Sequence, residues 1–237
     1  MKKVMLLGAF FLSALAIQAQ SVDEIVNKHV EAMGGADKYK NLKAIRMQTS
    51  TELMGQSLPT TSVIALGKGM RSDVTVMGAT ISQGYDGQQG WMINPMQGST
   101  AAEATPAELN ASMDVQLDIT GPFYNYKEKG NTIELLGKEK LDGADVYKVK
   151  ITRKNGLTET QYLDAATYMN RKTVSVLEVG GQKNENETMF SDYRAVEGLK
   201  FPFVTQMTHP QFGTMKMKVD KLEVNPVIDE TKFKMPK

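Results

Sequence analysis

The sequence has no cysteine among its 237 residues. A chain without cysteine forms no disulfide and has no thiol for catalysis or zinc binding. It also lacks the cysteine that carries the lipid of a lipoprotein, so we expect no lipid anchor. The folded protein must therefore be held together by its apolar core.

Long apolar runs are equally scarce. Val4–Ile17 follows two lysines and precedes a short stretch of small and polar residues, which is the pattern of a secretory signal peptide. The run is shorter than the roughly 20 apolar residues that a spanning helix needs. We predict that residues 1–20 are a cleaved signal peptide and that residues 21–237 form a single domain, exported to the periplasm. The alternative is an uncleaved N-terminal anchor.

An excess of basic charge is also missing. Without Lys2 and Lys3, 26 basic residues face 27 acidic ones, a net charge of −1. Proteins that bind nucleic acid draw much of their affinity from a basic patch. We therefore expect no nucleic-acid partner.

Motifs for chemistry are absent as well. The two histidines, His29 and His209, lie far apart and no cysteine accompanies them, so we predict no metal site. There is no G-x-S-x-G turn, no phosphate-binding loop and no dinucleotide fingerprint. We predict no catalytic residues and no cofactor, and we disfavour an exported hydrolase.

The pattern that does run through the chain is that of antiparallel strands. Apolar and polar residues alternate over segments such as Met70–Val76, and turn pairs such as Asp86–Gly87 and Asn155–Gly156 join successive segments. No β-α-β rhythm points to a parallel sheet. We predict about ten or eleven strands in a meander that must curl or close.

Two segments have helical patterns instead. Apolar residues at helical spacing from Val22 to Met33 predict an N-terminal helix that ends at Gly34–Gly35. Thr105 followed by Pro106 and an acidic turn predicts a second helix over Pro106–Leu117. This helix interrupts the succession of strands.

The only tryptophan lies in a hairpin over Tyr85–Pro95. The strand after the turn places Trp91 and Ile93 on one face, and Asn94–Pro95 ends it because proline has no N–H for a ladder. The ring is either a core side chain or part of a cavity wall. Both interpretations are compatible with the sequence.

Together these features resemble the outer-membrane lipoprotein carriers, the LolA/LolB-like fold. The hairpin resembles the D-G-x-x-x-W-x-x-N-P segment of that family, and Thr105–Leu117 lies where the family has helices. Two further stretches are similar to family segments: Phe190–Tyr193 with Gly198–Pro202, and the ending Asn225–Pro236. One departure is Gly69, near which the carriers have a cavity arginine; Arg71 is close by.

The resemblance implies a mainly β fold, an open, half-closed antiparallel β-barrel with an N-terminal helix and a helical lid. It also implies an apolar concave face that takes lipid acyl chains or a lipoprotein. We expect a periplasmic carrier-like protein that is a monomer. The alternative is an interaction or sensor module of the same fold, which acts through its surface on an envelope membrane protein.

The candidate cavity residues are apolar side chains of the predicted strands. Methionine is abundant, with 16 residues in the chain, and its flexible thioether suits variable apolar ligands, although ordinary core methionines would look the same. The predicted lining residues are Met70, Val74, Val76, Trp91, Ile93, Met215, Met217 and Val219.

Overall fold

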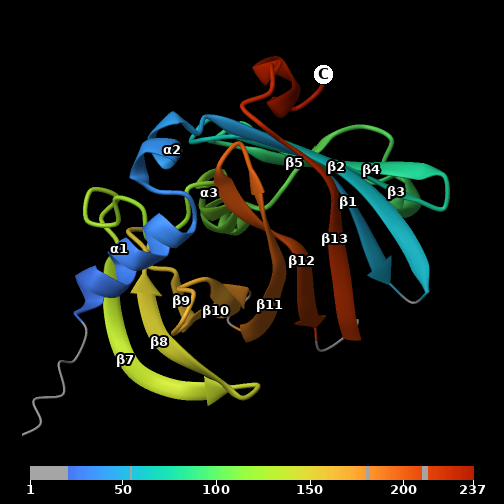
Figure 1. Cartoon of the computed structure of the whole chain (residues 1–237). Helices are drawn as coiled ribbons and strands as arrows, with labels where there is room; N and C mark the ends of the chain where they lie inside the picture. The colour runs from blue at the N-terminus through green and yellow to red at the C-terminus, as the bar shows by residue number, and fades with distance from the viewer. Residues whose placement is uncertain (1–20, 54, 180–181, 210–212) are drawn as a thin grey trace, which may run out of the picture.

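One antiparallel sheet dominates the computed structural model, which describes residues 21–53, 55–179, 182–209 and 213–237 (Figure 1). Its strands are β1 (Ala44–Leu53), β2 (Gln56–Ala65), β3 (Gly69–Val76), β4 (Ala79–Tyr85), β5 (Gly90–Ile93), β6 (Glu103–Ala104), β7 (Thr132–Leu141), β8 (Ala144–Thr152), β9 (Thr158–Asp164), β10 (Asn170–Val179), β11 (Gln182–Val196), β12 (Leu199–His209) and β13 (Gly213–Val224). The predicted signal peptide, residues 1–20, lies outside the described residues, so its boundary with the domain stays a prediction.

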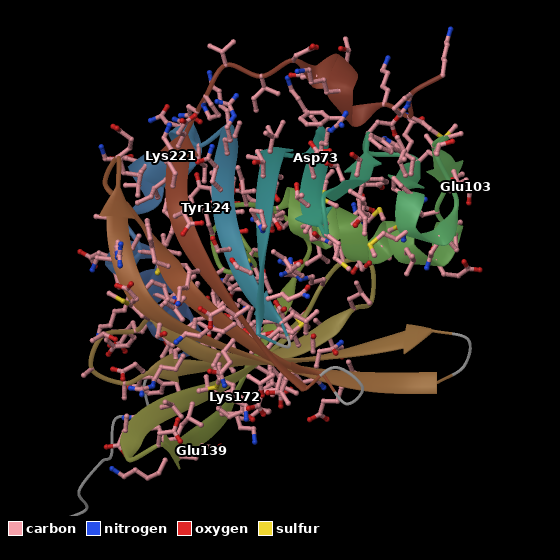
Figure 2. All side chains as sticks on the ribbon, turned by 90° about the vertical axis from the view of Figure 1, so that its right-hand side faces the viewer. Asp73, Glu103, Tyr124, Glu139, Lys172 and Lys221 are labelled. Atoms are coloured by element: carbon pink, nitrogen blue, oxygen red, sulfur yellow. The ribbon has the colours of Figure 1, made fainter. Side chains whose placement is uncertain are left out.

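The sheet curls but does not close. The strand order is β6-β5-β4-β3-β2-β1-β13-β12-β11-β10-β9-β8-β7, so β6 and β7 form its two edges. Figure 2 shows Glu103 of β6 and Glu139 of β7 on opposite sides of the molecule. The predicted open, half-closed barrel is therefore confirmed. The described residues form thirteen strands instead of ten or eleven, partly because the two-residue β6 adds to the Trp91 strand.

Three helices are described, namely α1 (Val22–Ala32), α2 (Ala36–Asn41) and α3 (Asn110–Leu117), together with the 3₁₀ turns η1 (Pro95–Gln97), η2 (Ala107–Leu109) and η3 (Glu230–Phe233). The side chain of Ser21 caps α1 by accepting a hydrogen bond from the Glu24 N–H at 3.1 Å. The second predicted helix begins later than expected. Pro106 is extended, with ψ 139°, so η2 precedes α3.

The ladder pairing assigns side chains to the two faces, because directly paired residues of an antiparallel sheet share a face. Ile45 pairs with Ile64, Ile64 with Met70, and Met70 with Tyr85. These residues pack against α2 and α3, so this is the concave face that the helices cover. The opposite, convex face meets the C-terminal turn η3, which lies outside the curl in Figure 1.

Three apolar clusters fix the helices on the concave face. Helix α1 packs over β8 and β9, α2 over the start of β1, and α3 over β3 and β4. The buried residues of these clusters are Ile25, Val26, Phe123, Tyr147, Val149, Ile151 and Leu163 with α1; Tyr39, Leu42, Ile45 and Leu199 with α2; and Met70, Tyr85, Met113 and Leu117 with α3.

Candidate ligand-binding site

Six of the eight predicted lining residues share the concave face. Val74 pairs with Thr60, Thr60 with Thr49, and Thr49 with Val219. Met217 pairs with Thr51 on the same side of β1. The residues that the sheet brings to this face are Met70, Val74, Val76, Met215, Met217 and Val219.

These six differ in burial. Met70 is 5% exposed under α3, and Val219 is 9% exposed. Val74, Val76, Met215 and Met217 are only half-buried. The four half-buried residues lie toward the ends of β3 and β13 that point away from the helices, so the concave face keeps apolar surface there. We call these four residues the concave strip.

Trp91 and Ile93 lie on the convex face instead. Trp91 pairs with Gly84, and Ile93 pairs with Ser82. In β4, Gly84 directly precedes Tyr85, which faces α3, so Gly84 and Ser82 lie on the opposite face of the sheet. The Trp91 ring is 0% exposed, and its Nε1–H donates a hydrogen bond of 2.7 Å to the carbonyl oxygen of Phe233. The sheet therefore separates Trp91 from the concave strip, and the ring is a packed side chain beneath η3.

The convex face has a groove of about 590 Å³ beside η3, lined by charged side chains together with apolar residues of β2 and the C-terminal segment. Arg71 reaches Asp73 with N–O distances of 2.9–3.1 Å and lies 5.5 Å from the Trp91 ring centre. Arg46 pairs with Glu223 at 2.7 Å. The groove therefore presents paired charges beside apolar side chains. Arg71, the nearest arginine to the position where the carriers have one, does not face the concave strip.

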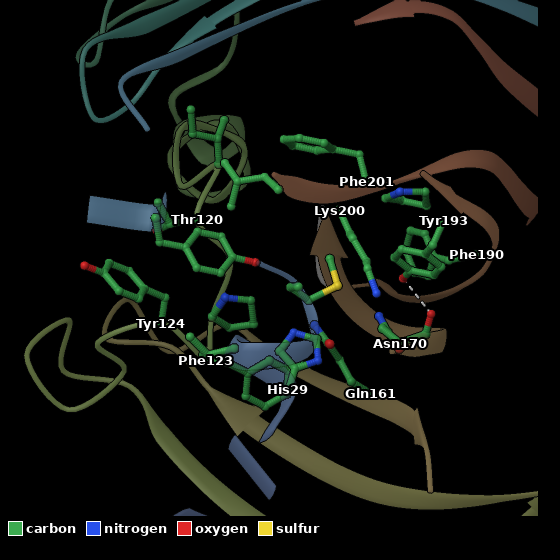
Figure 3. Close-up of a pocket in the computed structure, with 18 residues that line it drawn as sticks. His29, Thr120, Phe123, Tyr124, Gln161, Asn170, Phe190, Tyr193, Lys200 and Phe201 are labelled. Carbon is green, nitrogen blue, oxygen red and sulfur yellow. Dashed lines mark hydrogen bonds between the residues drawn. The ribbon is translucent and has the colours of Figure 1, made fainter. Parts of the chain in front are cut away.

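An apolar pocket of about 200 Å³ lies on the helix side, between α1, α2, the 119–124 segment and the ends of β11 and β12 (Figure 3). Its apolar walls are Val30, Met33, Ile119, Pro122, Phe123, Tyr124, Phe190, Leu199, Phe201 and Pro202. A second hollow of about 190 Å³ lies beside α3 and includes Val115, Leu157 and Val176. Polar and charged side chains line the rest of this second hollow, so the pocket beside α1 and α2 is the more apolar of the two.

Close backbone contact holds the turn between β11 and β12 against the end of α1. The Lys200 N–H donates a hydrogen bond of 2.8 Å to the Met33 carbonyl oxygen. A Cβ on Gly34 would lie 2.5 Å from the Gly198 carbonyl oxygen, and Gly34 has φ +130°. Glycine is therefore required there, because only a residue without Cβ permits both the approach and the backbone conformation.

A few polar groups interrupt the apolar wall. His29 Nδ1 lies 2.7 Å from the Tyr168 carbonyl oxygen, which requires a proton on Nδ1. Burial lowers the pKa of His29 to about 4, so the ring is neutral at pH 7. The Tyr193 hydroxyl donates to the Asn170 carbonyl oxygen at 2.7 Å, and burial raises the pKa of Tyr193. The remaining polar side chains of the wall are Tyr39, Thr120, Gln161, Asn170 and Lys200.

None of the eight predicted residues lines this pocket. Its walls come from helix ends, a loop and a strand turn, where no two-residue alternation marks the inward side. A signal was nevertheless present in the aromatic cluster of Phe123 and Tyr124 directly after Gly121–Pro122. Large aromatic side chains in a loop need a packed site, which here is the pocket wall.

Two further observations on the described parts of the chain concern clusters of metal-binding side chains and membrane-spanning helices. Over those residues, no group of three or more histidine, aspartate or glutamate side chains is placed to hold a metal ion. None of the described helices is long and apolar enough to cross a membrane.

The fold and the pocket together define an open antiparallel barrel with helices and apolar hollows on its concave side. No family model and no curated protein matches the sequence. Solved structures with the same fold do match, and the three described below are 10–15% identical to this chain. The chain therefore shares the LolA-like fold, as the sequence resemblance predicted.

Three of these structures illustrate the likeness. A DUF1329 family protein from Desulfovibrio piger has a TM-score of 0.60 and 14% identity, covering 91% of this chain and 98% of its own. A putative outer membrane lipoprotein-sorting protein domain from Vibrio parahaemolyticus has a TM-score of 0.57 and 15% identity, and the match covers 89% of this chain and 95% of that one. A LolA superfamily protein from Nitrosomonas europaea has a TM-score of 0.60 and 10% identity, and the match covers 91% of this chain and 98% of that one.

Proposed function

We propose that this protein is a carrier-like binding protein for lipid acyl chains or a lipoprotein, and that it works in the periplasm after export. The observation that carries the proposal is the concave side of the sheet. There, an apolar pocket of about 200 Å³ and the half-buried concave strip share one side of the molecule. The fold it shares with LolA superfamily and lipoprotein-sorting structures supports the same function.

Apolar surface left open on a concave face favours an apolar ligand. Exposed concave hydrocarbon is unfavourable in water, and such surfaces mark binding sites in soluble proteins. The strip contains two methionines, Met215 and Met217, whose flexible side chains adapt to chains of different shape. We infer that the strip and the pocket contact different parts of one ligand.

Helix α3 is the lid in this proposal. Most residues from Thr100 to Glu108, which lead to α3, are exposed and bury little surface. Near this approach, Thr105 Oγ1 and Asn110 Oδ1 are buried without a hydrogen-bond partner. An unpaired buried polar atom costs about 1–3 kcal/mol. Opening the lid would expose both atoms to water and recover part of that cost, which partly offsets the apolar contacts of Met113 and Leu117 that opening would break.

Charge substitutions on the two faces test the binding face. We expect Met217→Glu or Val76→Glu to abolish binding of an apolar fluorescent probe, because an unpaired carboxylate on an apolar binding surface is strongly unfavourable. The matched controls are Lys216→Glu and Thr75→Glu, whose exposed side chains lie next along the same strands on the convex face. These controls should bind the probe like the wild type.

The same experiment can overturn the proposal. If both sets of variants behave alike, or if the wild type binds no apolar probe, the concave side is not a ligand site. The protein would then act through its surface on an envelope partner. Native mass spectrometry of protein isolated gently from the periplasm adds a direct readout, since co-purified lipid supports a carrier.

A further inference from the structure

We propose that the pocket between α1 and β12 binds an alkyl or acyl chain with an anionic head group, and that the Lys200 ammonium pairs with that head group. This inference rests on the proposed function, because it names the class of ligand for the same apolar side. The head group is a carboxylate or a phosphate monoester. Both present several acceptor oxygens to an ammonium group.

The charge balance of the pocket is the first argument. Among its 18 lining residues there is one lysine, Lys200, and no aspartate or glutamate. The other ionisable nitrogen base of the wall, His29, is neutral because burial lowers its pKa to about 4. The wall therefore has one positive charge and no negative charge to balance it.

The contacts of Lys200 are the second argument. Within the described residues, its Nζ forms no salt bridge and no side-chain hydrogen bond, while its backbone N–H is fixed to Met33. Figure 3 shows the side chain pointing into the pocket, toward Asn170 and Gln161. The backbone bond thus fixes the base of a half-buried side chain whose ammonium group, within the described residues, has no acceptor in the pocket.

A neighbouring lysine, Lys129, offers a comparison, because the protein itself supplies the acceptors for its ammonium group. Lys129 Nζ lies 2.6 Å from Asp118 Oδ1, 2.7 Å from Thr120 Oγ1 and 2.7 Å from the Gly121 carbonyl oxygen. Among the residues that the structure describes, Lys129 therefore has a complete set of acceptors and Lys200 has none. A partly desolvated cation is unfavourable unless an opposite charge accompanies it.

Two buried amides stand beside the ammonium group. Gln161 is 7% exposed and Asn170 is 8% exposed. The Gln161 Nε2 lies 3.4 Å from Glu159 Oε1, which is long for a hydrogen bond, so this amide can turn to a better acceptor. It would add a second donor to the head-group oxygens. Asn170 is committed, since its Nδ2 donates to Thr173 Oγ1 at 2.8 Å.

The size of the pocket sets the length of chain that it encloses. A buried apolar cavity of about 150 Å³ already binds benzene, and this pocket measures about 200 Å³. It therefore takes a short hydrocarbon segment beside the head group. The rest of a longer chain would pass over the concave face.

Titration calorimetry with three ten-carbon probes tests the inference, using decanoate, decyl phosphate and 1-decanol. We expect at least one anionic probe to bind the wild type about tenfold or more tighter than 1-decanol, which corresponds to about 1.4 kcal/mol. Lys200→Met should remove this preference and leave 1-decanol affinity unchanged. Lys200→Arg should keep most of it. Lys216→Met, at an exposed position on the convex face, is the matched control and should behave as wild type.

The outcomes separate this inference from the proposed function. Equal affinity of the wild type for all three probes overturns the role of Lys200 and leaves the apolar site standing. Failure of every probe to bind overturns both. A preference for decanoate or for decyl phosphate identifies which head group is accepted, and either result supports the inference. If Lys200→Met does not fold, Lys200→Gln takes its place, and the loss of the wild-type preference for the anionic probe in that variant is the test.

Discussion

The two faces of the sheet use apolar side chains in opposite ways. On the convex face, Trp91 is 0% exposed and Phe233 is 2% exposed, and the indole N–H donates to the backbone of the C-terminal turn. On the concave strip, residues such as Val74 and Met217 stay half-buried. The difference teaches that a large buried aromatic marks where the fold is fastened, whereas half-buried aliphatic side chains mark where it stays open.

Two glycines show how tightly the convex side is packed. A Cβ on Gly69 would lie 2.7 Å from the Phe233 ring, and one on Gly84 would lie 2.4 Å from the Trp91 ring. Neither glycine has a positive φ, so the reason for glycine is space. The rings occupy the volume that side chains at these positions would need.

The largest effect that we expect from a single substitution is on this side. Trp91→Ala should lower the free energy of unfolding by about 3–5 kcal/mol, because it leaves a cavity beneath η3. Binding of an apolar probe to the concave side should change little. Denaturant unfolding and probe titration measure the two quantities. An unchanged unfolding midpoint would show that the ring is not part of the core.

Gly84→Ala breaks the same contact from the other side. The added Cβ meets a rigid indole ring that cannot move without losing its bond to Phe233, so we expect a loss of about 3 kcal/mol, the upper end of the usual overpacking cost. Thr80→Ala, at an exposed position of β4, is the control. In a Trp91→Ala background the cost of Gly84→Ala should largely vanish, and a persisting cost would contradict the clash.

Acid should lower the free energy of unfolding of the protein through His29, which lies on the helix side of the sheet. Its pKa is lowered from 6.5 to about 4 by burial, so the unfolded chain binds more protons between these values. Its contribution to stability is complete above pH 6.5 and is lost as the pH falls toward 4. Between pH 7 and pH 5 we expect a loss of about 2 kcal/mol. His29→Gln should lack this component, and an equal pH dependence in the variant would contradict it.

The sequence predicted the curled antiparallel sheet because the alternation of strands such as Met70–Val76 and turns such as Asn155–Gly156 are local signals. It also predicted both main helices. Ser21 marks the start of α1 correctly, whereas Thr105–Pro106 precedes the 3₁₀ turn η2 and α3 begins only at Asn110. The count of strands was too low partly because β6 consists of two residues that owe their conformation to Trp91 and Met92. No local pattern marks so short a strand.

The candidate site was less accessible to sequence reasoning. Alternation groups residues within one strand, so Met215 and Met217 were correctly placed together, and so were Trp91 and Ile93. Which of these groups share a face depends on the register between strands, which links Trp91 to Gly84 and not to Met70. The pocket around Lys200 depends on contacts between distant segments, such as the bond from Lys200 to Met33.

The smallest stability effect that we expect belongs to the concave strip. Met217→Ala should lower the free energy of unfolding by less than about 1 kcal/mol, well below the 2–5 kcal/mol typical of a fully buried methionine. The reason is that water and ligand already reach this side chain, so its removal leaves no closed cavity. Apolar-probe affinity should fall measurably instead, whereas Lys216→Ala on the convex face should alter neither quantity. A loss of stability comparable to that of Trp91→Ala would mean that the strip is core, and the contrast between the two faces would fail.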